Sequence, residues 1–115
     1  MKYAVYQISY TDSDIDAINA EQPNAAYTAK RDMQFDFGGK GIANMAEKAF
    51  YEGLYTGVAL IEADSLDQVF EIGNMGPESK ITRLSRMSSV SVGDLIEDED
   101  GNRHVVASFG FKEVA

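Results

Sequence analysis

The feature that constrains the fold most is an amphipathic helix pattern that leads directly into an apolar run. Apolar side chains recur at helical spacing on one face of a segment, at the positions Ile42, Met45, Ala46, Ala49 and Phe50. Gly53 then favours a helix end, and residues 54–63 are apolar over a length too short for a buried helix with its caps. The pattern predicts a helix followed by a central strand.

Two segments before this junction also have strand or helix patterns. Residues 2–10 are rich in aromatic and β-branched side chains and alternate so that both faces of a strand carry apolar groups. Residues 12–20 follow cap-forming oxygens and form a short predicted helix. Between residue 20 and the helix at Ile42, apolar residues alternate at Met33, Phe35 and Phe37. This alternation predicts a short or edge strand.

The C-terminal half begins with a helix at Ser65, which has capping-box spacing to Gln68. Its expected packed face consists of Leu66, Val69, Phe70 and Gly73. A polar connector over 78–91 precedes a turn at 91–94, a strand at 95–97, a hairpin loop at 98–102, a return strand at 104–108 and a last short strand at 112–114.

These elements predict one α+β domain over residues 1–115. We expect a mixed or mainly antiparallel sheet, packed against about three helices, with a C-terminal β-hairpin. Large apolar residues from several elements should share one core, and we expect them to be Phe50, Leu60, Phe70, Val106 and Phe109.

Composition excludes several classes of site and of protein. The chain has no Cys, which excludes disulfides, thiolate zinc sites and cysteine nucleophiles and fits a reducing cytoplasm. No apolar run reaches the roughly 18 residues of a membrane span, and the first strand turns polar at Gln7 before a signal-peptide core could form. We expect a cytoplasmic protein without a cofactor.

His104 is the only histidine, so the usual zinc ligand sets cannot be assembled and no metal site is predicted. No nucleophile-elbow sequence accompanies it, and we predict no catalytic residue. We expect His104 to be a strand residue that faces solvent.

Charge is the strongest functional signal. The chain carries 19 acidic and 10 basic residues, a formal charge of -9, which disfavours general binding to nucleic acid or to anionic membranes. Four consecutive carboxylates occupy the predicted hairpin tip, and we predict that they bind a basic protein partner: Glu97, Asp98, Glu99 and Asp100.

The connector holds the alternative site. Lys80, Arg83 and Arg86 recur every third residue, each followed by an apolar residue. In a helical turn the cations would form one exposed strip, which is a candidate for binding phosphate or carboxylate. In a loop the apolar residues would be buried, and the neighbouring cations would only offset the negative charge of the acidic hairpin.

The C-terminal segment resembles the YodL-like small proteins and domains of phages, plasmids and integrative elements. The residues that carry this resemblance are Ser91-Val92-Gly93-Asp94-Leu95-Ile96, then Gly101, Val105-Val106 and Phe109-Gly110-Phe111, with Leu66 to Asn74 upstream. The resemblance covers about 50 residues and implies a mobile-element setting and a small α+β domain, with no enzyme activity to carry over. A more distant likeness is to PUA-like and ASCH-like RNA-binding barrels, from whose basic surface this acidic chain departs.

The repeated glycines of this segment also have a structural interpretation. Gly93 can take a positive φ at a tight turn, where Asp94 can accept backbone hydrogen bonds. We therefore predict a non-enzymatic accessory protein of a phage or mobile element that binds a protein partner, with inhibition of a nucleic-acid-binding defence complex by charge mimicry as its sharpest form. The alternatives are a PUA-like RNA- or nucleotide-binding module and a small hydrolase.

Overall fold

A computed structural model describes all of residues 1–115 and contains one six-stranded sheet in which every neighbouring pair is antiparallel. The spatial order of the strands is β3-β2-β1-β4-β5-β6. The two longest strands are central, and the full set is β1 (Lys2–Ile8), β2 (Tyr55–Glu62), β3 (Ile81–Arg83), β4 (Leu95–Glu97), β5 (Arg103–Val106) and β6 (Phe111–Val114). The α+β fold with a C-terminal strand pair is confirmed.

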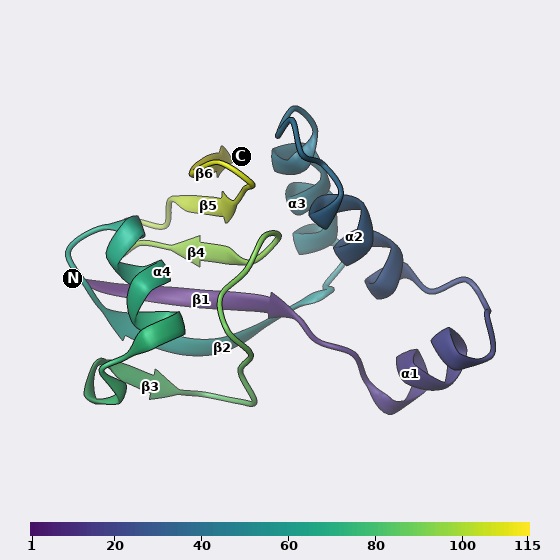
Figure 1. Cartoon of the computed structure of the whole chain (residues 1–115), viewed down its shortest axis with the longest axis horizontal. Coiled ribbons are helices and arrows are strands. Elements are labelled where there is room, and N and C mark those ends of the chain that lie inside the picture. The colour runs from purple at the N-terminus through teal and green to yellow at the C-terminus, as the bar shows by residue number, and fades with distance from the viewer.

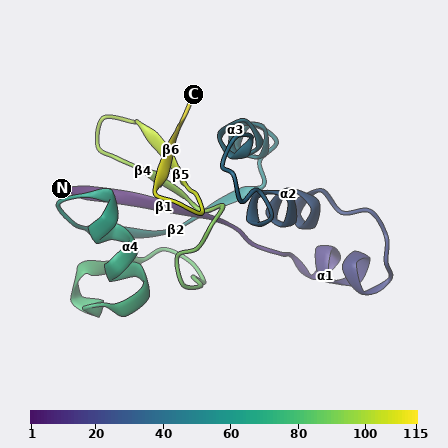
Figure 2. The same cartoon turned by 45° about the horizontal axis from the view of Figure 1, so that its top comes forward.

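Helices cover both faces of the sheet (Figures 1 and 2). One face carries α4 (Leu66–Met75), which packs on β2, and the other carries α2 (Ala25–Gln34) and α3 (Ile42–Tyr51), of which α3 packs on β5 and β6. The remaining helix, α1 (Asp12–Asn19), contacts α2, has no buried residue and lies at the far end of the long axis (Figure 1).

The sheet therefore separates two hydrophobic cores, because adjacent residues of a strand point to opposite faces. Ile96 and Val106 belong to the core under α4, whereas their neighbours Leu95 and Val105 belong to the core under α2 and α3. In β1, Val5 and Ile8 are buried in different cores, which confirms the strand with two covered faces. The expectation of one shared core is wrong.

Local capping explains where the helices start. Thr11 accepts a hydrogen bond from the backbone N–H of Asp14, whose carboxylate accepts in return from Thr11, so α1 begins with a capping box. Ser65 accepts from Gln68 N at the start of α4. After α3, Gly53 adopts a φ of +75°, a conformation that favours glycine, and the chain then turns into β2. These three helices and β2 are confirmed.

The edge strand predicted around residues 33–37 is wrong, because this part of the chain ends a helix. Asn24 caps the start of α2 by accepting from Tyr27 N, a signal hidden by the lack of a clear period in residues 21–30. Met33 is fully buried in the last turn of α2, while Phe35 and Phe37 follow the helix and are each 67% exposed. The alternation of the three side chains reflects a helix end and a turn.

Two of the five expected core residues are also wrong. Phe70 is exposed because the buried face of α4 is formed by Val69 and Ile72 instead. Phe109 is 86% exposed, since the chain bends at Gly110 between β5 and β6. Val106 is buried as expected, and Phe50 and Leu60 are half-buried.

No helix of the structure combines the length and the apolar character that a membrane crossing needs.

Candidate functional site

The four hairpin carboxylates lie in different surroundings. Glu97 points to the face of the sheet under α3, where it is half-buried and pairs with Arg103 at 3.0 Å (Oε2 to Nε). The Arg103 guanidinium in turn lies 4.1 Å from the centre of the Phe50 ring. Asp98 organises the loop itself, because its Oδ1 accepts from the backbone N–H groups of Asp100 and Asn102. Two of the four thus have internal partners that fix the hairpin.

Glu99 and Asp100 remain exposed and have no ion-pair partner. Glu99 accepts a hydrogen bond from the backbone N–H of Lys2 at 3.2 Å, which places the loop beside the start of β1. The antiparallel pairing of β1 with β2 brings Glu62 to the same place, opposite Lys2. We call the carboxylates that gather here the acidic end: Glu62, Asp64, Asp98, Glu99 and Asp100.

Two carboxyls of the acidic end, those of Asp98 and Glu62, have lowered pKa values. Hydrogen bonds from the backbone N–H of Asn102 lower the pKa of Asp98 below its ordinary value. The Met1 amine donates to Glu62 Oε1 at 2.9 Å and lowers the pKa of that carboxyl. Both carboxyls are therefore ionised at neutral pH, and the cations beside Glu62, which are the Met1 amine, Lys2 and Lys80, offset part of the negative charge.

A second group of carboxylates lies at the opposite end of the molecule (Figure 1). Helix α1 carries Asp12, Asp14 and Asp16 and no basic residue. The longest dimension of the molecule is 41 Å, and it runs from the acidic end to α1. Negative charge is therefore present at both ends of an elongated protein.

The three cations of the connector do not form a helical strip, so the helical alternative is wrong. Lys80 ends the short 3-10 helix η1 (Glu78–Lys80), Arg83 ends edge strand β3, and Arg86 lies in coil. Residues Ile81 and Met87 are half-buried, but Leu84 is exposed. A strand and a coil do not place every third residue in one row, and the cations therefore face different surroundings.

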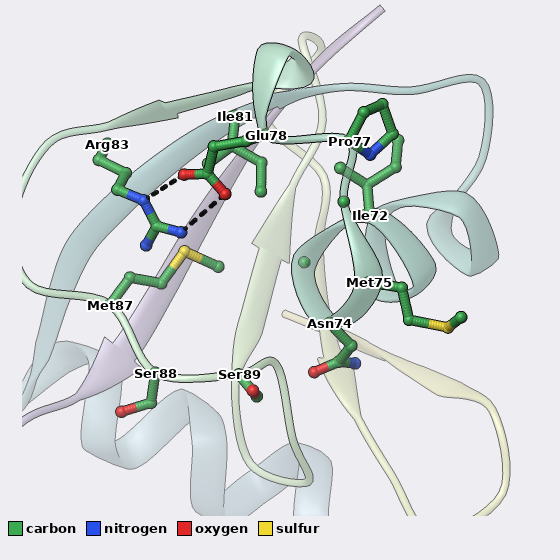
Figure 3. Close-up of a pocket in the computed structure, with 12 residues that line it drawn as sticks. Ile72, Asn74, Met75, Pro77, Glu78, Ile81, Arg83, Met87, Ser88 and Ser89 are labelled. Atoms are coloured by element: carbon green, nitrogen blue, oxygen red, sulfur yellow. Dashed lines mark hydrogen bonds and ion pairs between the residues drawn. The ribbon is translucent and has the colours of Figure 1, made fainter.

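Arg83 lines a hollow of about 400 Å³ at the end of α4, drawn in Figure 3. Its guanidinium makes two hydrogen bonds to the Glu78 carboxylate, at 2.7 Å and 3.1 Å, and the two opposite charges neutralise each other. Apolar side chains from three segments complete the lining, namely Ile72, Ile81 and Met87. The Arg83 charge is thus balanced within the chain.

Arg86 lines a different hollow, of about 410 Å³, beside the end of β1. We call it the β1 hollow. The segment Met87–Ser89 lines both hollows and so separates them. Lys30 of α2 and the buried residues Gln7 and Asp94 also line the β1 hollow, together with Ile8, Ser9, Tyr10, Ile15 and Ser91.

Gln7 and Asp94 are the only buried polar side chains of the protein, 5% and 4% exposed. Gln7 Nε2 donates to Asp94 Oδ2 at 3.0 Å and to the carbonyl oxygen of Ser88 at 3.0 Å, while its Oε1 accepts from Ser88 N at 3.0 Å. Asp94 Oδ2 also accepts from Ser91 N at 2.9 Å. This network ties the connector to the centre of the sheet.

The predicted turn at residues 91–94 is confirmed in its details. Gly93 has a φ of +97°, and Asp94 accepts the backbone hydrogen bond from Ser91. Burial raises the pKa of Asp94 to about 6. The Tyr55 hydroxyl donates to the Gly93 carbonyl at 2.6 Å, and burial raises the pKa of this hydroxyl above its ordinary value.

His104 lies on β5 and is half-buried, which corrects the expectation that it faces solvent. Its Nδ1 atom is buried without a hydrogen-bond partner. Nowhere do three or more His, Asp or Glu side chains gather closely enough to hold a metal ion.

Comparisons of the chain with protein-family models, curated proteins and solved structures find no match.

The sequence did not reveal which distant residues complete the acidic end and the β1 hollow. Glu62 and Asp64 lie far from the hairpin in the chain and join it only through the pairing of β1 with β2. Gln7 gave a usable signal, since it is a polar residue within an apolar strand, and such a residue, when buried, requires a hydrogen-bond partner. Lys30 gave none, because its helix was not recognised.

Proposed function

We propose that the protein is a non-enzymatic accessory protein of a phage or other mobile element that binds a basic protein partner in the cytoplasm through its acidic end. The observation that carries this proposal is the convergence of carboxylates from separate segments. Glu62 and Asp64 come from the end of β2, whereas Glu99 and Asp100 lie between β4 and β5. The resemblance of the C-terminal segment to YodL-like proteins supports the mobile-element setting.

Convergence matters because the fields of neighbouring charges add. Isolated surface carboxylates are screened by salt within about 10 Å, but a cluster of one sign raises the rate at which a partner of opposite sign arrives. The internal hydrogen bonds of Asp98 hold the hairpin in one conformation, so little ordering entropy is lost on binding.

The sharpest form of the proposal is that the partner is a nucleic-acid-binding defence complex, whose basic surface the protein occupies. DNA presents regularly spaced negative charge along its axis. The protein carries carboxylates at both ends of a 41 Å axis, a length equal to roughly 12 base pairs at about 3.4 Å each. A surface that is complementary to DNA would meet negative charge at both ends of this protein.

The alternative, a module that binds RNA through Lys80, Arg83 and Arg86, receives less support from the geometry. Arg83 is paired with Glu78, and Arg86 opens to another hollow, so the three cations offer no continuous track for a phosphate backbone. For the small hydrolase, no serine or threonine hydroxyl is hydrogen-bonded to a histidine or a carboxylate base.

A displacement assay tests the proposal. The protein is titrated into purified basic nucleic-acid-binding proteins, each loaded with a fluorescent DNA duplex, at low and at physiological salt. We expect DNA release from at least one member of the panel, with no binding of DNA or RNA by the protein itself. Failure to displace DNA from any member, or a tight complex between the protein and RNA at physiological salt, would contradict the proposal.

Charge variants assign the effect to a surface. The double variant Glu99→Gln, Asp100→Asn removes two exposed charges and leaves the loop-forming Asp98 intact. A matched control, Glu52→Gln with Glu71→Gln, removes two exposed charges, one at the C-cap of α3 and one on α4. We expect the first variant to displace DNA more weakly, most clearly at low salt, and the control to act like the unmodified protein. Equal loss in both would mean that total charge, and not the acidic end, is responsible.

A further inference from the structure

The β1 hollow is lined by two cations that form no ion pair and by one acidic residue, Asp94, which lies close enough to Lys30 for their charges to interact. No ion pair of the protein includes Lys30 or Arg86, although acidic residues outnumber basic ones by 19 to 10. Lys30 Nζ lies 3.5 Å from the carbonyl oxygen of Ile8 and 5.4 Å from the centre of the Tyr10 ring. Two unpaired cations beside one hollow make it a place where an anion is favoured.

Hydroxyl groups add further donors to the same hollow. Its lining includes four serines, and none of their hydroxyls makes a hydrogen bond within the chain: Ser9, Ser88, Ser89 and Ser91. A carboxylate has only two oxygens to satisfy, whereas a phosphate monoester offers three oxygens and nearly two negative charges. The combination of two cations and four hydroxyls fits the phosphate better.

A free acceptor atom on a mostly buried side chain is the second feature. Asp94 is 4% exposed, and both hydrogen bonds that it accepts go to Oδ2. Oδ1 has no partner within the chain and is not a buried atom, so this oxygen is free to accept a hydrogen bond from a group in the hollow. Because a phosphate would be repelled here, the group that meets Asp94 must be a hydrogen-bond donor.

We propose that the β1 hollow binds a nucleoside monophosphate, with its phosphate at Lys30 and Arg86 and with N–H groups of its base donating to Asp94. A nucleotide carries these two kinds of group at opposite ends of one molecule. The apolar side chains of Ile15 and Met87 supply surface for a flat base. The hollow, at about 410 Å³, has the size of a small-molecule site.

Titration of the isotope-labelled full chain with AMP, GMP, CMP and UMP, followed by NMR, tests this proposal. We expect at least one nucleotide to shift the backbone signals of Tyr10, Ser88 and Ser91 in a saturable manner. Inorganic phosphate lacks the base, and the corresponding nucleoside lacks the phosphate. Each should bind at least about tenfold more weakly than the nucleotide. Equal affinity for inorganic phosphate would overturn the role of Asp94, and no saturable shift with any nucleotide would overturn the site.

Variants separate the site from general charge effects. Arg86→Gln should weaken nucleotide binding about tenfold, whereas Lys80→Gln, which removes a positive charge outside the hollow, should leave it unchanged. Asp94→Asn should also weaken binding, and because this change is buried, Lys30→Gln provides a second test. Binding that survives both Arg86→Gln and Lys30→Gln contradicts the proposal. The Glu99→Gln, Asp100→Asn variant should bind the nucleotide normally, so this inference and the proposed function can fail separately.

Discussion

Gln7 in the centre of the sheet and Asp94 in the turn before β4 are joined by a 3.0 Å hydrogen bond from Nε2 to Oδ2. Both side chains are buried, and each also holds backbone groups of the connector between β3 and β4. A segment with little regular structure thereby acquires a defined position, and with it the two hollows that the segment borders.

The first prediction concerns Gln7. The variant Gln7→Leu keeps the approximate volume but removes one of the two donors to Asp94 and both bonds to the backbone of Ser88, so the free energy of unfolding should fall by about 2–4 kcal/mol. Urea denaturation measures this loss. Gln34→Leu, an exposed change on α2, should have little effect. Equal stability of the two variants would contradict the structural role of the Gln7 network.

The second prediction concerns Asp94. Its pKa of about 6 in the folded protein exceeds the ordinary aspartate value, so the folded state binds the proton more tightly than the unfolded state does. The stabilisation from this group is present at low pH and is lost as the pH rises through about 6. Relative to Asp94→Asn, the unmodified protein should be more stable at pH 5 than at pH 7, by about 1 kcal/mol.

NMR of the carboxyl carbon checks the same prediction directly. The side-chain signal of Asp94 should titrate with a midpoint near pH 6. Lys30 is the charged group that opposes the shift, and Lys30→Gln should therefore raise this midpoint. A midpoint below pH 4 would show that Asp94 is better solvated than the structure indicates.

The third prediction concerns α2, where sequence patterns and structure disagree. Met33→Ala removes a fully buried side chain and should destabilise the protein by about 2–5 kcal/mol. Phe109→Ala removes a larger side chain that is 86% exposed, and should change stability by only about 0.5 kcal/mol. Thermal or urea unfolding of the two variants measures the difference, and the opposite order would restore the original assignment of the core.

The fourth prediction concerns the contact between α4 and the connector. A methyl group at Gly73 would collide with the Val90 side chain. Gly73→Ala, which favours an isolated helix, should therefore destabilise this protein by about 1–3 kcal/mol. In a Val90→Ala background, where the collision is relieved, Gly73→Ala should destabilise the protein less than it does in the unmodified protein. A double-mutant cycle measures this difference. A stabilising Gly73→Ala would mean that α4 and Val90 are not packed as described.

Much of the fold could be predicted from sequence because its signals are local. The face of α3, the cap of α4 and the turn at Gly93 depend on residues within a few positions of one another. The end of α2 could not be predicted in the same way, because Met33, Phe35 and Phe37 alternate although a helix terminates among them. Its packing against α3, which buries Met33, is a tertiary effect.

The two candidate sites differ in the same respect. The hairpin acids could be identified because they are consecutive in the chain. Their interactions could not be predicted, because Glu97 pairs with Arg103 and Asp98 accepts hydrogen bonds from the backbone of its own loop. The β1 hollow depends on contacts between β1, α2 and the connector, which sequence spacing does not encode.

The measurement that tests the account most directly is NMR mapping of the isotope-labelled protein with a basic nucleic-acid-binding protein that releases its DNA in the displacement assay. The account predicts that the perturbed backbone signals belong mainly to residues 62–67 and 97–102, and that DNA or RNA alone perturbs none of these residues. Perturbations confined to the connector and the β1 hollow, with residues 97–102 unchanged, would contradict the assignment of partner binding to the acidic end.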